Sequence, residues 1–149
     1  MLDIKDLYQD IIIDHNRSPR NFGKLEHATR VAEGYNPLCG DRLTVYLNLD
    51  ANIIKDIRFE GTGCAISVAS ASLMTDHLKS KTKAEAEEIF QNFHTLLTRD
   101  NEQPEAEMLG KLSALAGVKE YPVRVKCATL CWHTLHSALN GKETIVSTE

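Results

Sequence analysis

An alternating stretch in the first half of the chain restricts the fold more than any other feature. From residue 43 to residue 49, leucine or valine occupies every second position, and polar or aromatic residues stand between them. This period of two predicts a strand with one buried face. The turn-forming residues 50–52 and the apolar stretch 53–59 then predict an antiparallel hairpin. In the second strand, three apolar side chains should share a face: Ile53, Ile57 and Phe59.

A third strand over residues 28–35 would extend this hairpin into a small sheet, and much of the remaining chain has helical spacing. Helices are predicted over five stretches: residues 2–16, 64–79, 83–97, 105–116 and 126–139. Gly117 should end the fourth helix, residues 100–104 should form a polar connector, and the tail over 142–149 should be frayed. We therefore expect an α+β fold: one compact domain over residues 1–149, with about three antiparallel strands and helices packed over them.

Composition narrows the function. The net charge of −4 argues against a nucleic-acid binder that works through phosphate contacts. No apolar run approaches the length of a membrane span, and the first residues lack a signal-peptide core, so we expect a cytoplasmic protein that does not contact a membrane. Four cysteines are too few for a disulfide-stapled domain. In a reducing compartment, cysteines in loops and at helix starts are more often metal ligands or catalytic groups.

Three of these cysteines have such a context. Cys39 lies in a turn-forming stretch with Asp41 two residues later, Cys64 follows Gly61-Thr62-Gly63, and Cys127 follows a basic stretch. Three thiols and one carboxylate make the four ligands that a tetrahedral zinc needs. We expect Cys64 and Cys127 to lie at helix starts, where the helix dipole would lower the pKa values of their thiols.

Each of these observations has an alternative. The cysteines could be small buried hydrophobic residues. Cys131, four residues after Cys127, could be a fifth thiol near the metal, although a core position beside Trp132 is favoured. Arg124 and Lys126 could offset the negative charge of the site or be solvated surface charges. None of the histidines directly flanks a cysteine, so each is expected to be a surface or core residue.

The stretches 36–41, 61–67 and 123–130, which contain the three cysteines, resemble the IscU/NifU-N family of iron–sulfur cluster assembly proteins. The resemblance extends from the N-terminal helix to about Leu139 and implies the same α+β fold. Scaffold members, the IscU branch, typically have histidine directly before the third cysteine and a Leu-Pro-Pro-Val-Lys motif upstream. Here Lys126 precedes Cys127, and the upstream stretch is Tyr121-Pro122-Val123-Arg124. The segment 100–120 resembles the insertion of the SufU branch, so the chain is similar to SufU proteins.

The resemblance implies that Cys39, Asp41, Cys64 and Cys127 bind zinc. It also implies that Cys39 is the catalytic residue, which leaves the zinc and accepts persulfide sulfur from a SufS-type cysteine desulfurase. The sulfur would then pass to downstream iron–sulfur assembly proteins. Such a protein is a monomeric, sulfurtransferase-like carrier rather than a conventional turnover enzyme.

Two alternatives stay open. The same four residues could assemble a [2Fe–2S] cluster in a scaffold protein. They could also bind zinc in a purely structural domain that mediates protein contacts.

Overall fold

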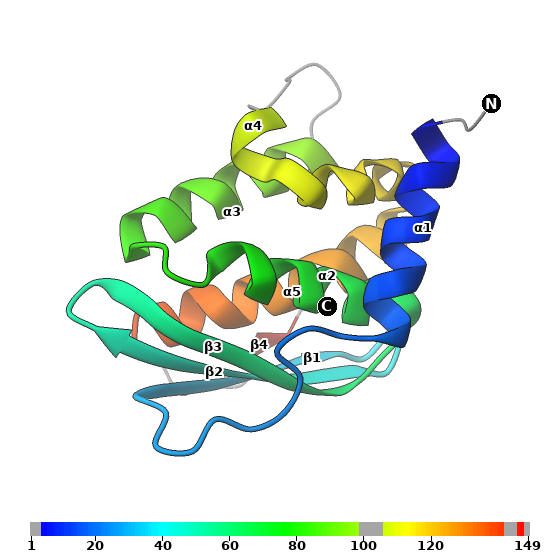
Figure 1. Cartoon of the computed structure of the whole chain (residues 1–149). Helices are drawn as coiled ribbons and strands as arrows, with labels where there is room; N and C mark the ends of the chain where they lie inside the picture. The colour runs from blue at the N-terminus through cyan, green and yellow to red at the C-terminus, as the bar shows by residue number, and fades with distance from the viewer. Residues whose placement is uncertain (1–3, 99–105, 142–145, 148–149) are drawn as a thin grey trace.

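A computed structural model describes residues 4–98, 106–141 and 146–147 of the chain. Within these ranges, helices cover one face of a small sheet (Figure 1). The helices are α1 (Ile4–Arg17), α2 (Ala65–Leu78), α3 (Lys83–Thr98), α4 (Ala106–Leu109), the 3₁₀ helix η1 (Gly110–Glu120) and α5 (Pro122–Leu139). The strands are β1 (Arg30–Asn36), β2 (Asp41–Asp50), β3 (Ile53–Thr62) and β4 (Val146–Ser147).

The sheet has the strand order β3-β2-β1-β4. Strands β1, β2 and β3 form the predicted antiparallel meander, so the α+β class and the three-stranded antiparallel sheet are confirmed. β4 adds to the free edge of β1 in parallel, with Gly34 opposite Val146. At Val146 and Ser147 the structure therefore has a strand where we predicted a frayed tail, because β1 offers unpaired backbone groups at this edge.

The predicted alternation of β2 is confirmed, but one face of β3 was predicted wrongly. Leu43 and Leu47 of β2 are fully buried. In β3, Ile54 is buried and Ile53 is exposed, the reverse of the expected pattern. Asn48 pairs with Asp56 and Leu49 with Ile54, so Lys55 is an extra residue on β3. This bulge shifts the alternation by one residue before Ile57 and Phe59, which lie on the buried face as predicted.

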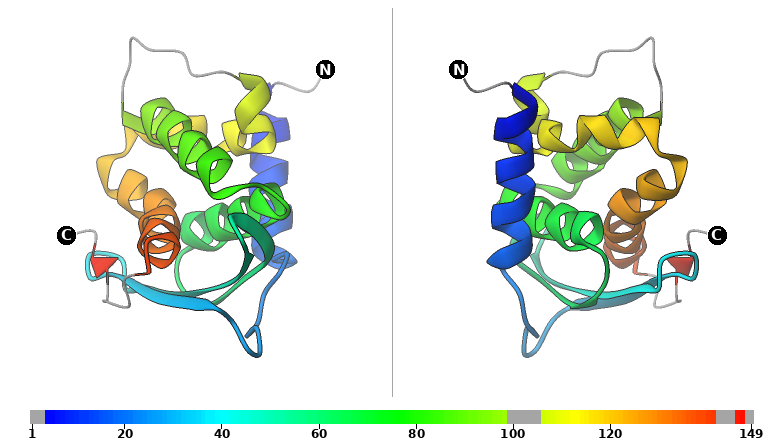
Figure 2. Two further views of the ribbon diagram at one scale, coloured as in Figure 1. Left: turned by 90° about the vertical axis from the view of Figure 1, so that its left-hand side faces the viewer. Right: turned by 90° about the vertical axis from the view of Figure 1, so that its right-hand side faces the viewer.

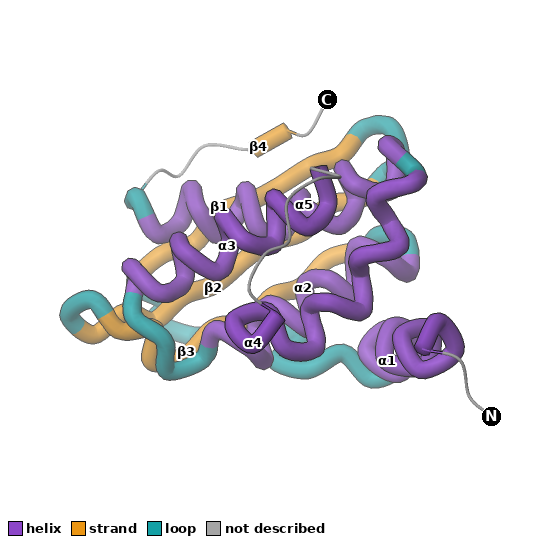
Figure 3. The backbone as a smooth tube through the Cα atoms, turned by 90° about the horizontal axis from the view of Figure 1, so that it is seen from above, coloured by secondary structure: helices purple, strands orange, loops and turns teal. Residues whose placement is uncertain are grey.

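The helices form two layers above the sheet (Figure 2). α2 and α5 pack against each other and against the strands, as the view from above shows (Figure 3). α3 and η1 lie farther from the sheet, and α1 packs against one end of α2. Trp132 of α5 is fully buried and stacks on Phe93 of α3, with 5.0 Å between the ring centroids. α2 and α5 are thus the two helices that connect the sheet to the outer layer.

Two helix boundaries differ from the predicted ones. A helix over 105–116 was expected, but the described α-helix α4 ends at Leu109, because Gly110 has a φ of +51° and the chain continues as η1 beyond Gly117 to Glu120. The predicted connector 100–104 lies outside the described residues. The last helix begins at Pro122 rather than at Lys126. Proline suits the first position of a helix because its fixed φ is helical. It lacks a backbone N–H, but an N–H at this position would have no partner within the helix.

None of the helices in the described part of the chain is long and apolar enough to cross a membrane.

Candidate metal centre

The β1–β2 hairpin positions the first two candidate ligands. β1 ends at Asn36 and β2 begins at Asp41, and these two residues are opposite each other in the sheet. The turn between them is closed by the Asn36 side chain, whose Oδ1 accepts a hydrogen bond from the backbone N–H of Leu38 at 3.2 Å. Gly40 has a φ of +71°, a conformation that side-chain-bearing residues rarely adopt. Cys39 therefore lies half-buried in the hairpin turn, and Asp41 is fully buried at the start of β2.

Cys64 links this hairpin to α2. It is the N-cap residue of α2, with extended backbone geometry, so its predicted place at a helix start is confirmed. Its backbone N–H donates a hydrogen bond of 2.8 Å to Oδ1 of Asp41. The Asp41 carboxylate therefore satisfies a backbone donor at the start of α2, where the helix dipole favours negative charge.

Cys127 was expected at a helix start, and this expectation is wrong. α5 begins at Pro122, so Cys127 lies in its second turn, and its side chain is fully buried. Burial raises the pKa of the Cys127 thiol well above its ordinary value, and the neighbouring Cys39, Asp41 and Cys64 raise it further. The expected lowering of this pKa is therefore reversed in the metal-free chain, because desolvation disfavours the thiolate.

The hairpin turn, the start of β2 and α5 converge on one point. Ligand atoms of Cys39, Asp41 and Cys127 all lie within 4.8 Å of one another. The Cys127 thiol donates to Sγ of Cys39 at 3.0 Å. Cys64 is not part of this tight group, but its backbone contacts Asp41 and its thiol is close enough to raise the pKa of Cys127.

This donor set fits a divalent metal ion. It combines sulfur atoms with a carboxylate oxygen, which are ligand types that zinc accepts in tetrahedral sites. Asp41 and Cys127 are both fully buried, and a buried negative charge is costly unless a cation or hydrogen bonds compensate it. Cys39, Asp41 and Cys127, with Cys64 beside them, are therefore the residues that could bind such an ion.

Sequence reasoning missed Asn36. This residue is fully buried, and its Nδ2 donates to Oδ2 of Asp41 at 3.4 Å and to Sγ of Cys127 at 3.6 Å. Its side chain thus contacts two candidate ligands while its Oδ1 shapes the hairpin turn. The signal in the sequence is Asn36-Pro37, which predicts a turn but not that the amide faces the site.

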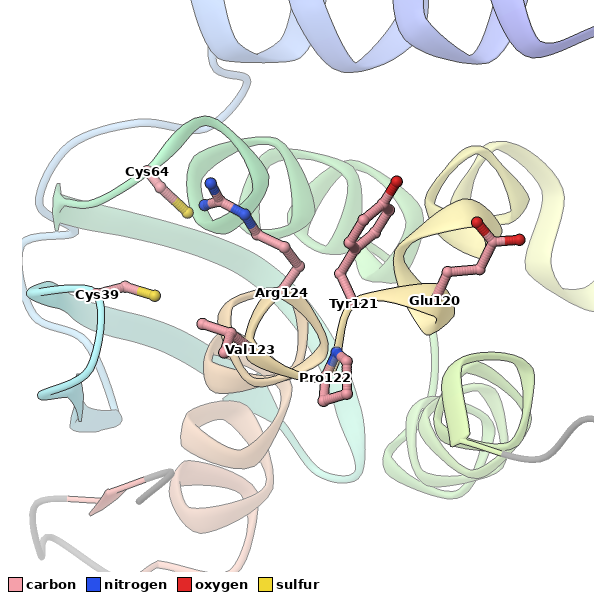
Figure 4. Close-up of a pocket in the computed structure, with 7 residues that line it drawn as sticks. All are labelled: Cys39, Cys64, Glu120, Tyr121, Pro122, Val123 and Arg124. Carbon is pink, nitrogen blue, oxygen red and sulfur yellow. The ribbon is translucent and has the colours of Figure 1, made fainter.

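A pocket of about 540 Å³ opens beside the two half-buried thiols (Figure 4). Its lining consists of Cys39, Cys64, Glu120, Tyr121, Pro122, Val123 and Arg124. The exposed Arg124 side chain extends toward Cys64 (Figure 4). The negative charge of a Cys64 thiolate raises the pKa of Arg124, with smaller contributions from Cys127 and Cys39. Arg124 therefore lies where it can offset the charge of the site, whereas Lys126 is half-buried on α5 and does not line this pocket.

The fourth cysteine belongs to the core. Cys131 is fully buried, and its thiol donates to Oγ of Ser70 on α2 at 3.5 Å. Burial raises the pKa of the Cys131 thiol to about 12. The favoured core assignment for Cys131 is therefore confirmed, and the fifth-thiol alternative is not.

Comparison with known proteins places these residues in a family. Residues 7–128 match the NifU-like N terminal domain. Zinc-dependent sulfurtransferase SufU of Bacillus subtilis (strain 168) is 40% identical over 137 residues, which cover 92% of this chain and 92% of that protein. The iron–sulfur cluster assembly scaffold protein IscU of Streptococcus pyogenes serotype M1 is 38% identical over 136 residues, which cover 91% and 84%.

A solved structure agrees with this assignment. The crystal structure of FiSufU, a protein of the SUF system from the thermophile Fervidobacterium islandicum AW-1, superposes with a TM-score of 0.83 at 39% identity. The alignment covers 92% of this chain and 99% of that one. The resemblance inferred from the cysteine motifs is therefore confirmed, and the chain belongs to the family of proteins with a NifU-like N-terminal domain.

Proposed function

We propose that this protein is a zinc-dependent sulfur-transfer protein of iron–sulfur cluster assembly. In this proposal, Cys39 accepts persulfide sulfur from a SufS-type cysteine desulfurase and passes it to downstream assembly proteins. One observation carries the proposal: Cys39 is both a member of the converging ligand group and part of the lining of an open pocket. The sequence similarity to a protein named zinc-dependent sulfurtransferase supports it.

Cys39, Asp41, Cys64 and Cys127 would together hold the zinc ion. Bound zinc would keep the cysteine ligands as thiolates at neutral pH, which the buried Cys127 does not achieve alone.

The proposed reaction is a thiol–persulfide exchange. The Cys39 thiolate attacks the terminal sulfur of the desulfurase persulfide, the sulfur–sulfur bond of that persulfide breaks, and the desulfurase cysteine leaves as a thiolate. Cys39 then carries the terminal sulfur as its own persulfide. No external oxidant or reductant is needed, because the electron pair of the broken bond leaves with the desulfurase sulfur.

Accessibility distinguishes Cys39 from the other thiols. Cys127 is fully buried and cannot meet a partner's persulfide without local opening. Cys64 is half-buried, and its position is fixed by the hydrogen bond from its backbone to Asp41. Cys39 is half-buried in a hairpin turn, where the Asn36 side chain bonds the backbone N–H of Leu38. A turn can change conformation at a lower cost than the second turn of a packed helix.

The surface around this pocket suits a protein partner. Tyr121 and Val123, which line the pocket, are 61% and 51% exposed, and Leu38, the residue before Cys39, is 61% exposed. Exposed apolar side chains around a pocket are typical of a docking surface. The Arg124 guanidinium adds a positive charge beside Cys64 that would favour an anionic persulfide in the pocket. Together these residues support docking of a desulfurase over Cys39.

The second candidate is a scaffold that assembles a [2Fe–2S] cluster on the same four residues. It is favoured by the 38% identity to a protein named as a scaffold. Metal and acid-labile sulfide in protein purified without oxygen distinguish the two candidates. About one zinc per chain without sulfide supports sulfur transfer, whereas stoichiometric iron with sulfide supports the scaffold.

Sulfur acceptance tests the role of Cys39 directly. We expect Cys39→Ala to abolish the transfer of labelled sulfur from a persulfide-loaded desulfurase, while Cys131→Ala, which removes a core thiol, leaves transfer unchanged. Acceptance at the normal rate by Cys39→Ala would refute the assignment. A tightly held zinc with no reactive thiol would instead favour the structural zinc domain. The monomeric state, the cytoplasmic location and the single-domain organisation stay predictions.

A further inference from the structure

Ser67 has an unusual environment for a buried hydroxyl group. It is fully buried at the third position of α2, and its Oγ has no hydrogen-bond partner among the described residues. An unpaired buried hydroxyl is destabilising, and alanine at this position would avoid that cost. The hydroxyl group therefore needs an explanation other than folding.

Other buried hydroxyl groups on α2 and α5 do have hydrogen-bond partners. Ser70 Oγ donates to the carbonyl of Ala128 at 2.6 Å, and Ser72 Oγ bonds to His15 and to the backbone N–H of Arg20. Buried threonines bond to carbonyl oxygens of the preceding helical turn: Thr75, Thr129 and Thr134. The lack of a partner at Ser67 is therefore not a general property of α2 and α5.

The location of Ser67 indicates which group its hydroxyl can bond. A Cβ atom added to Gly63 would lie 2.8 Å from Oδ1 of Asp41 and 3.1 Å from Oγ of Ser67. The carboxylate and the hydroxyl group thus face the same small space, which stays open because residue 63 is glycine. Among the described residues, one other buried side-chain polar atom lacks a partner: Nε1 of Trp132. The Trp132 ring stacks on Phe90 and Phe93 and not on the ligand group.

At the start of α2, the N–H group that a side chain at the position of Ser67 often binds already has another acceptor. At many helix starts, the side chain of the third residue accepts a hydrogen bond from the N–H of the N-cap residue. Here Asp41, from a different element, accepts the N–H of Cys64 at 2.8 Å. Ser67 Oγ therefore does not accept this N–H, and its hydroxyl hydrogen, which has no acceptor among the described residues, is available to donate to the nearby carboxylate. Oδ1 of Asp41 can accept a second hydrogen bond, because each carboxylate oxygen has two acceptor sites.

We propose that Ser67 is a positioning residue for the metal site: its hydroxyl group donates a hydrogen bond to the Asp41 carboxylate when the site holds its metal ion. This bond would fix the carboxylate orientation and leave the other lone pairs of Asp41 for the metal. Outer partners of this kind orient metal ligands and strengthen metal binding. The inference rests on the proposed metal site but not on sulfur transfer.

The test compares Ser67→Ala with Ser72→Ala, which removes a buried hydroxyl from the same helix whose partners are His15 and the backbone N–H of Arg20. In metal-free protein, we expect Ser67→Ala to have an unchanged or higher melting temperature, because no bond is lost, and Ser72→Ala to have a lower one. Zinc affinity, measured by chelator competition, should fall about tenfold or more in Ser67→Ala and stay unchanged in Ser72→Ala. The d–d absorption bands of the cobalt(II)-substituted protein should shift in Ser67→Ala alone.

A double-mutant cycle with Asp41→Ala identifies the ligand through which Ser67 acts. Once Asp41 is absent, Ser67→Ala should cause no further loss of zinc affinity. An equal loss in both backgrounds, wild-type zinc affinity in Ser67→Ala, or failure of metal-free Ser67→Ala to fold would each overturn the proposal. If wild-type protein binds neither zinc nor cobalt, the proposed metal site itself is wrong, and this outcome is distinguishable from a failure of the Ser67 inference alone.

Discussion

Asp41 has two separable roles, and two substitutions distinguish them. Its Oδ1 accepts the N–H of Cys64, which joins β2 to the start of α2 in the metal-free chain. Its carboxylate also belongs to the converging ligand group. Asp41→Asn keeps a side-chain oxygen that can accept the Cys64 N–H but removes the charge. Asp41→Ala removes both the acceptor and the charge.

The expected magnitudes follow from these contacts. A buried donor that loses its acceptor costs about 1–3 kcal/mol. Cys64 is half-buried, so water can partly replace the lost acceptor. We therefore expect the free energy of unfolding of metal-free Asp41→Ala to be about 1–2 kcal/mol lower than that of Asp41→Asn. For zinc, both variants lose the anionic ligand. Since even outer partners of metal ligands contribute about 10–100-fold to affinity, we expect a loss of at least about 100-fold in both.

Two assays measure these roles independently. Urea unfolding of the metal-free variants under reducing conditions gives the free-energy difference, and chelator competition gives the zinc affinity. Equal stabilities of the Asn and Ala variants would refute the inference that Asp41 anchors the start of α2. Wild-type zinc affinity in Asp41→Ala would remove Asp41 from the metal site. A loss of affinity in the Ala variant but not in the Asn variant would mean that the charge of Asp41 is unimportant.

Three further outcomes are expected. Iodoacetamide at pH 8 should alkylate Cys39 in the folded, metal-free protein but not Cys131, whose thiol is buried and has its pKa raised to about 12; equal labelling of both in mass spectra would contradict this. Burial lowers the pKa of His15 from its ordinary value of 6.5, so the unfolded chain binds more protons than the folded chain below about pH 6.5, and the free energy of unfolding should fall there. Between pH 7.5 and pH 5.5, metal-free His15→Gln should lose less free energy of unfolding than metal-free wild type. Phe93→Ala should cost about 3–5 kcal/mol in urea unfolding, because Phe93 is fully buried against Trp132, and a cost below about 1 kcal/mol would argue against this packing.

The strands were predictable because their pattern is local. The alternation from Leu43 to Leu47 depends only on which face of β2 is buried, and the sequence carries it directly. The error at Ile53 and Ile54 arose where an extra residue, Lys55, interrupts the pairing with β2. A bulge is decided by the partner strand, so the sequence of β3 alone does not show it.

The helix boundaries also depend partly on local sequence signals and partly on the tertiary structure. Gly110 ends α4 through a positive φ, although glycine also occurs seven residues later, where it does not end the segment. Pro122 lies before the predicted helix 126–139 but is the first residue of α5. Both residues are strong local signals whose meaning depends on neighbouring elements.

By itself, the sequence determined the residue types of the site, the order of the helices and of the first three strands, and the family to which the chain belongs. Cysteine, aspartate and glycine in their local contexts are sufficient to indicate metal chemistry. The tertiary structure decided how these residues differ in burial and in their contacts. It buries Cys127 in the second turn of α5, leaves Cys39 half-buried in a turn, and places Asn36 and Ser67 beside Asp41. These differences arise from packing between β1, β2, α2 and α5, and contacts between segments so distant in the chain leave no periodic pattern in the sequence.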